Sequence, residues 1–146
     1  MSQHRKWHPW RHLREHFPHV DVHFTDLAPL GLQGRLTSRG IELHRHSRQR
    51  ERRSTLTHEV SHLERGPVPK HPHFALREEL VVEEITARRM IPLPDLVDAV
   101  LWCQGRIDDE TAEELWVGLT VLKTRLTTLT SRERQWVERE LDRRLN

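Results

Sequence analysis

The chain of 146 residues has a single cysteine, Cys103, and no tyrosine. One thiol excludes both a disulfide framework and a zinc site built from several cysteines. Long apolar runs are lacking as well, so the sequence predicts neither a secretory leader nor a transmembrane helix. We therefore expect a cytoplasmic protein.

An excess of charge of one sign is also lacking. The 24 Lys and Arg residues are nearly balanced by 22 Asp and Glu residues, which leaves a formal net charge of +2. So slight an excess is only weak support for nucleic-acid binding. Histidine is abundant, with 12 residues, and the length and the hydrophobic fraction of 35% suit one small core.

Residues 1–9 are polar and basic, and we expect them to be frayed. Residues 10–17 have apolar side chains at helical spacing, which predicts a short helix. Alternation of apolar and polar residues predicts three strands, in segments 20–25, 35–37 and 41–44. We expect a small antiparallel sheet, because a turn at residues 38–40 joins the last two strands.

The rest of the chain is predicted to be helical, in segments 48–65, 74–91, 94–105, 108–116, 120–129 and from residue 130 onward. Ser47 is the expected N-cap of the first of these helices, and Thr130 with Glu133 forms a capping box for the last. The second helix has a predicted inward stripe at Leu76, Leu80, Ala87 and Ile91.

The helix predicted at 48–65 contains His58-Glu59-x-x-His62. Residues four apart lie on one face of a helix, so both imidazoles can point at one Zn²⁺ while Glu59 reaches a water on that metal. Composition alone would give roughly 0.1 such motifs in a chain this rich in His and Glu, so the context has to support the motif. We interpret it as a hydrolytic zinc site.

A catalytic zinc site needs a third protein ligand. Arg65 and Val68 stand where a metzincin would have its glycine and its third histidine, which excludes that arrangement. The helix predicted at 74–91 offers four glutamates instead, and we assign Glu79 as the ligand. Glu83, one turn further on, would accept the outer N–H of a ligand histidine. The alternative is that all four glutamates form a solvated acidic face.

Two segments, RRSTLTHEVSHLERG at 52–66 and ELVVEEITARRMIP at 79–92, resemble the ImmA/IrrE family of zinc metallopeptidases. The likeness is to the short forms from actinobacteria and their phages. Where the family pattern has a small residue and an Asn or Asp, this chain has Val82 and Glu83. The resemblance implies a gluzincin-like site in which His58, His62 and Glu79 bind Zn²⁺ and Glu59 is the general base.

With this resemblance, the expected fold is α+β, with the small antiparallel sheet packed on a gluzincin-like helical core. We expect the metallopeptidase core at residues 1–105 and a helical C-terminal subdomain at 106–146. A site of this kind also needs a donor to the oxyanion, and without tyrosine the candidates are His71 and His73, although such histidines are more often loop surface. The strand at 41–44 is the expected edge for an extended substrate.

Apolar spacing over residues 108–126 is loosely that of a helix-turn-helix. Residues exposed for base contact would then be Thr120, Lys123, Thr124 and Arg125. Because acidic residues at 108–114 would repel phosphate, we favour a packing or partner-docking role for these helices.

The function predicted first is a zinc endopeptidase, because His58, Glu59, His62 and Glu79 are all present. The family resemblance implies a protein substrate, a helix-turn-helix repressor of a phage or mobile element. One alternative is a regulator that binds this repressor without cleaving it. Another is a DNA-binding protein with structural zinc, which is disfavoured because structural sites use four ligands and favour cysteine.

Overall fold

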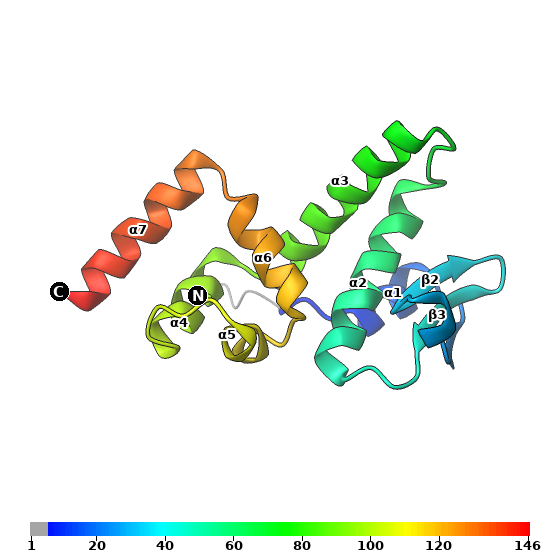
Figure 1. The fold of residues 1–146 in the computed structure, drawn as a ribbon, viewed down its shortest axis with the longest axis horizontal. Helices are drawn as coiled ribbons and strands as arrows, with labels where there is room; N and C mark the ends of the chain where they lie inside the picture. Colours follow the sequence, from blue (N-terminus) through cyan, green and yellow to red (C-terminus); the bar gives the residue numbers. More distant parts are fainter. Residues whose placement is uncertain (1–5) are drawn as a thin grey trace.

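The computed structural model describes residues 6–146, and this part of the chain forms seven α-helices and one three-stranded sheet (Figure 1). The N-terminal elements are α1 (Pro9–His16), β1 (Val22–Thr25), the 3₁₀ turn η1 (Ala28–Leu30), β2 (Gly34–Thr37) and β3 (Gly40–His44). The helices that follow are α2 (Gln49–Arg65), α3 (Pro72–Met90), α4 (Leu93–Trp102), α5 (Asp109–Glu114), α6 (Leu119–Thr127) and α7 (Ser131–Leu145). The predicted α+β class is confirmed.

The sheet is mixed, so the prediction of an antiparallel sheet is wrong. Its strand order is β1-β3-β2, with β3 parallel to β1 and antiparallel to β2. The segment between β1 and β2, which contains η1, carries the chain to the far edge, and the hairpin then returns β3 to the middle. The predicted substrate edge at 41–44 is therefore also wrong, because β3 has a neighbour on both sides and β2 is an edge strand.

One face of the sheet packs on α2. The side chains of Ile41 and Leu43 on β3 are fully buried against Leu56 and Val60 of α2, and Leu13 of α1 completes this cluster. Burying an aliphatic side chain of this size contributes about 1.5–3 kcal/mol. The sheet thus holds α2 by its apolar face and leaves another face free for the histidines.

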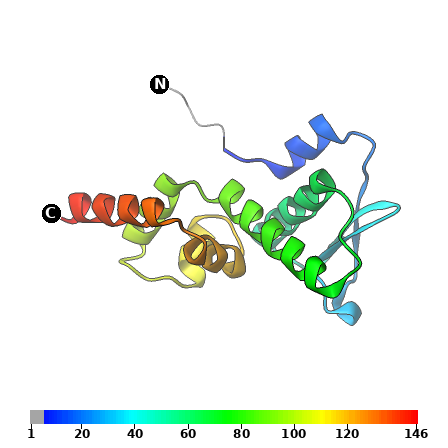
Figure 2. The ribbon, with the colours of Figure 1, turned by 90° about the horizontal axis from the view of Figure 1, so that it is seen from above.

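A second hydrophobic cluster joins the end of α3 to α4, α5 and α6. It contains Ile91, Leu96, Ala112 and Leu122, all fully buried. This cluster includes residues on both sides of residue 105, where we predicted a domain boundary; the boundary itself stays a prediction. Figures 1 and 2 show α7 extending outward from these helices. None of the helices within residues 6–146 is both long enough and apolar enough to cross a bilayer.

The segment before α1 is held against the rest of the molecule. The Trp7 indole N–H donates to Thr57 Oγ1 of α2 (2.8 Å), and the Arg89 guanidinium lies over its ring, 4.7 Å from the centroid. The prediction that residues 1–9 are frayed is therefore wrong for Trp7, and α1 already begins at Pro9. Residues 1–5 lie outside the described part of the chain.

Several predicted helix details differ from the structure. Arg48 is the N-cap of α2, while the Ser47 hydroxyl donates to the carbonyl of His44 (2.7 Å). On α3 the predicted inward stripe is only half right: Ala87 is buried, but Leu76 and Leu80 are 61% and 56% exposed. Figure 1 shows α6 beside the C-terminal end of α3, so the N-terminal turns of α3 extend past the helix that would cover them.

The C-terminal helices pack on the core, as favoured from the sequence. Arg125, one of the four residues considered for base contact, is only 3% exposed. Its guanidinium donates to the carbonyl of Ile91 (2.8 Å) and to the Glu133 carboxylate (3.2 Å). A guanidinium held in this way cannot reach a DNA groove, so the helix-turn-helix interpretation of α6 is wrong at this residue.

Glu133 connects three elements and is the basis of a first prediction. Hydrogen bonds from Arg88, from the backbone N–H of Thr130 and from Arg125 lower the pKa of Glu133 to about 2, while partial burial opposes them. A depressed carboxyl pKa stabilises the fold above its ordinary value of 4.5, and this stability is lost as the pH falls toward 2.

We expect Glu133→Gln to lower the free energy of unfolding by about 1–3 kcal/mol at pH 7. The difference from the wild type should shrink as the pH falls from about 5 to 2. Urea unfolding at several pH values measures it, with the exposed Glu138→Gln on the same helix as control. An equal loss at pH 7 and pH 2.5 would contradict the ion-pair explanation.

Candidate metal centre

The predicted ligands come together on facing surfaces of α2 and α3. His58 Nε2 lies 3.2 Å from Glu79 Oε2, and His62 Nε2 lies 2.9 Å from Glu79 Oε1. One ligand atom from each of the three residues lies within 4.8 Å of the other two. Two imidazole nitrogens and one carboxylate are close enough together to hold a metal ion, and this donor set matches sites that keep a coordination position open for water.

The helix geometry explains how this set forms. His58 and His62 are four residues apart on α2, so their rings lie on one face with centroids 4.8 Å apart. The opposite side of α2 is fixed by the sheet. Burial and the neighbouring His62 ring lower the pKa of His58, with Glu79 opposing them. A lowered pKa favours the neutral imidazole, which is the form that binds metal.

Glu59 is the residue after His58, the first ligand, and its side chain is buried. It is 7% exposed, and no hydrogen bond to it is formed within residues 6–146. Burial raises the pKa of Glu59 to about 7; the nearby Glu79 raises it further, and His62 opposes both. A carboxyl group with a pKa near neutrality is suited to accept and return a proton.

A cleft of about 790 Å³ runs past the ligands. It lies between the edge strand β2, represented by Gly34 and Leu36, and the helix surface that carries His58, His62 and Glu79. A Cβ on Gly34 would clash with the Thr55 side chain of α2, so glycine allows the strand to pass close to the helix. The cleft therefore offers a strand edge to whatever approaches the ligands.

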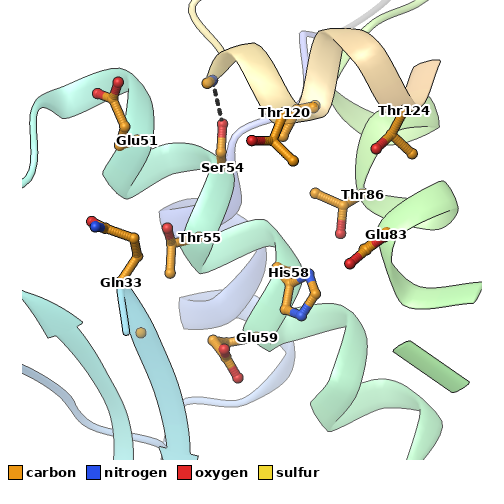
Figure 3. A pocket seen from close by; sticks show the side chains of 13 residues that line it. Gln33, Glu51, Ser54, Thr55, His58, Glu59, Glu83, Thr86, Thr120 and Thr124 are labelled. Carbon is orange, nitrogen blue, oxygen red and sulfur yellow. Dashed lines mark hydrogen bonds between the residues drawn. The ribbon is translucent and has the colours of Figure 1, made fainter. Parts of the chain in front are cut away.

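A second cavity, of about 320 Å³, adjoins the cleft on the side of α6 and shares Gly34, His58 and Glu59 with it (Figure 3). We call it the hydroxyl pocket, because its wall includes Ser54, Thr55, Thr86, Thr120 and Thr124. The backbone N–H of Gly118 donates to Ser54 Oγ (3.0 Å; dashed in Figure 3), which fixes the start of α6 on α2. Sequence reasoning missed this wall.

Only a faint signal in the sequence could have indicated this wall. Thr120 and Thr124 are spaced to share a helix face, but nothing local says which surface that face meets. In the structure both residues line the pocket beside His58, although we considered them for DNA contact from the sequence.

Glu83 does not make the contact expected of it. It lines the hydroxyl pocket with His58, but no hydrogen bond joins it to either ligand histidine. Instead, His62 Nδ1 is buried without a partner within the described chain. An orienting role for Glu83 thus stays a prediction without a supporting contact.

The structure does not bring His71 and His73 to the ligands. His71 is the N-cap of α3, and its Nδ1 accepts the backbone N–H of His73 (3.2 Å). Both residues are exposed, and neither is among the residues that line the cleft or the hydroxyl pocket. This geometry gives no support to the predicted oxyanion role. It also shows that α3 begins at Pro72, whereas the predicted start was residue 74.

The raised pKa of Glu59 leads to a prediction about the metal-free protein. A carboxyl whose folded-state pKa exceeds its ordinary value of 4.5 loses its contribution to stability as the pH rises through about 7. We expect Glu59→Gln to raise the free energy of unfolding of the metal-free protein by about 1–3 kcal/mol at pH 8 and to have little effect at pH 4. Denaturant unfolding in the presence of a chelator measures this difference. A gap of the same size at both pH values would show that ionisation is not its cause.

Comparison with protein-family models gives no match to this chain. Comparisons with curated proteins and with solved structures give no match either. The resemblance to the ImmA/IrrE family therefore stays a prediction from two motifs, and the interpretation of the site depends on its own geometry.

Proposed function

We propose that this chain is a zinc-dependent endopeptidase. The observation that carries the proposal is the convergence of His58, His62 and Glu79 beside the buried carboxyl of Glu59 in a cleft. Three ligands of these types leave a position for water, whereas a structural zinc site would need a fourth protein ligand. Within residues 6–146 no other group of His, Cys, Asp and Glu residues comes together in this way.

The residues of the chain have separate roles in this proposal. A bound Zn²⁺ would supply Lewis acidity toward a peptide carbonyl and toward water. Glu59 accepts a proton from the attacking water and returns it to the leaving amine. The edge strand β2 takes the place that we first gave to residues 41–44, and its free side pairs with an extended peptide.

The substrate remains the one that the ImmA/IrrE resemblance implies, a helix-turn-helix repressor of a phage or mobile element. An extended segment of such a protein fits a cleft beside a strand edge better than a small molecule does. The gluzincin-like character of the core is part of this same proposal.

Metal binding provides the first test. We expect about one zinc per chain, with affinity lost by more than about 100-fold in Glu79→Gln, because removing a ligand costs more than removing a group that only orients one. Competition with a chromophoric chelator measures the affinity, and Glu78→Gln, the adjacent carboxylate that pairs with Arg65, is the matched control. Equal zinc affinity in Glu79→Gln and Glu78→Gln would remove Glu79 from the ligand set.

Removal of the proposed base separates chemistry from metal binding. We expect Glu59→Gln to keep the zinc and to lower kcat/KM for peptide cleavage by about 100- to 10,000-fold. Mass spectrometry of a proteome-derived peptide library, and of any helix-turn-helix repressor encoded beside the gene, detects the cuts. Glu64→Gln, on the same helix and paired with Arg89, is the control. Relief of repression by Glu59→Gln without a cut would favour the non-cleaving regulator.

A further inference from the structure

The hydroxyl pocket adjoins the proposed reaction centre and belongs to the same surface. It lies between α2, α3 and α6 and meets the cleft at Gly34, His58 and Glu59. A peptide lying along β2 with a bond at the ligands would direct a neighbouring side chain into this pocket. The pocket is therefore placed to select a residue next to the scissile bond, if the proposed function holds.

The lining of the hydroxyl pocket contains acidic side chains but no lysine or arginine. Its wall contains three glutamates, Glu51, Glu59 and Glu83, and no lysine or arginine. Glu51 is neutralised from outside the pocket by Arg48 (2.9 Å) and Arg50 (3.1 Å). Glu59 and Glu83 have no ion pair and no hydrogen bond within residues 6–146. The pocket is thus lined by acidic side chains, and the described chain supplies no counter-charge for Glu83.

The burial of these groups makes the lack of a partner costly. Glu59 is more than nine-tenths buried and opens onto the pocket, and Glu83 is half-buried on the adjacent turn of α3 after Glu79. Figure 3 shows Glu83 on the far side of the pocket from Glu59, with His58 between them. A carboxylate withdrawn from water is stabilised by a cation that donates hydrogen bonds to it.

The hydroxyl groups favour a ligand that donates several hydrogen bonds. Those of Thr55, Thr120 and Thr124 form no hydrogen bond within residues 6–146, and their oxygens are available as acceptors. Thr86 gives its proton to the carbonyl of Val82 (2.8 Å), so toward the pocket it can only accept. A guanidinium or an ammonium group carries several donors and no acceptor, which matches this wall.

We infer that the hydroxyl pocket is a specificity subsite for an arginine or lysine side chain next to the scissile bond, with Glu83 as its counter-charge. An acidic side chain there would be repelled by the Glu83 carboxylate, which has no ion pair within residues 6–146, and an apolar one would leave that carboxylate without a partner. The cationic side chain enters from β2, places its charge at Glu83 and donates to the threonine hydroxyls of α3 and α6. This inference names a preference within the proposed peptidase function and rests on it.

Cleavage kinetics provide the first arm of the test. Peptides with arginine at either position flanking the cut are compared with peptides that carry citrulline, the neutral isostere, at the same position. We expect kcat/KM at least about tenfold higher for arginine at one position, with the advantage lost in Glu83→Gln and reversed toward glutamate in Glu83→Lys. Glu84→Gln, the next residue of α3, which pairs with Arg88 and does not line the pocket, should keep the wild-type preference.

Binding to the full-length protein provides the second arm, which does not need turnover. The amide resonances of α6 are followed during titration with acetyl-arginine methylamide and with acetyl-citrulline methylamide. We expect tighter binding of the arginine compound, by about tenfold, in the wild type and in Glu84→Gln but not in Glu83→Gln.

The two arms separate the inference from the proposed function. Equal binding of the two compounds to the wild type, or a preference that survives Glu83→Gln, overturns the pocket assignment even where peptides are cut. A Glu83-dependent preference for arginine in a protein that cleaves no peptide supports the pocket assignment and contradicts the peptidase proposal.

Discussion

The contact between α2 and α3 at the two histidines is the constraint on which the rest of the structure depends. His58 and His62 must share one face of α2, and α3 must cross that face with Glu79 opposite them. The remaining sides of α2 then have to be covered by other elements, because a helix that carries polar groups inward needs apolar packing elsewhere. The sheet and α1 cover one side, and the turn between α5 and α6 is bound to the helix near its start.

Burying polar groups around the site costs free energy, and hydrogen bonds within α2 and to the C-terminal part of the chain offset this cost. Hydroxyl groups on the buried faces of α2, such as those of Ser54, Thr57 and Ser61, donate hydrogen bonds to carbonyls one turn earlier on the same helix. Arg50, near the start of α2, donates to Asp109 of α5 and to the carbonyl of Val117 in the turn between α5 and α6. These bonds satisfy several of the polar groups around the site, whereas Glu59, Glu83 and the Nδ1 atom of His62 have no hydrogen-bond partner within residues 6–146.

The C-terminal helices contribute to the site as well as to the core. Their apolar residues form the second hydrophobic cluster with the end of α3, while the threonine face of α6 closes the pocket beside the ligands. This arrangement explains why Arg125 is buried and why Thr120 and Thr124 are turned toward α2 and α3. Helices whose apolar spacing is loosely that of a helix-turn-helix, and for which we favoured a packing role, are therefore part of the wall of a peptide site in the proposed function.

Local signals in the sequence predicted the helices, the three strands, the capping box at Thr130 and the two ligand histidines, because helical periodicity and the His-Glu-x-x-His spacing act over a few residues. Glu79 was assigned because a zinc site needs a third ligand, and a tertiary contact between α2 and α3 places it beside the histidines. Signals of this range say nothing about strand order, so the central place of β3 and the mixed sheet were decided by tertiary pairing. The exposure of Leu76 and Leu80 was decided in the same way, because it depends on how far α6 reaches along α3. The sequence by itself determined which side chains could bind a metal. Only the packing of α6 and β2 against α2 decided what surrounds them, because those contacts join different elements of the chain, as the bond from Gly118 to Ser54 does.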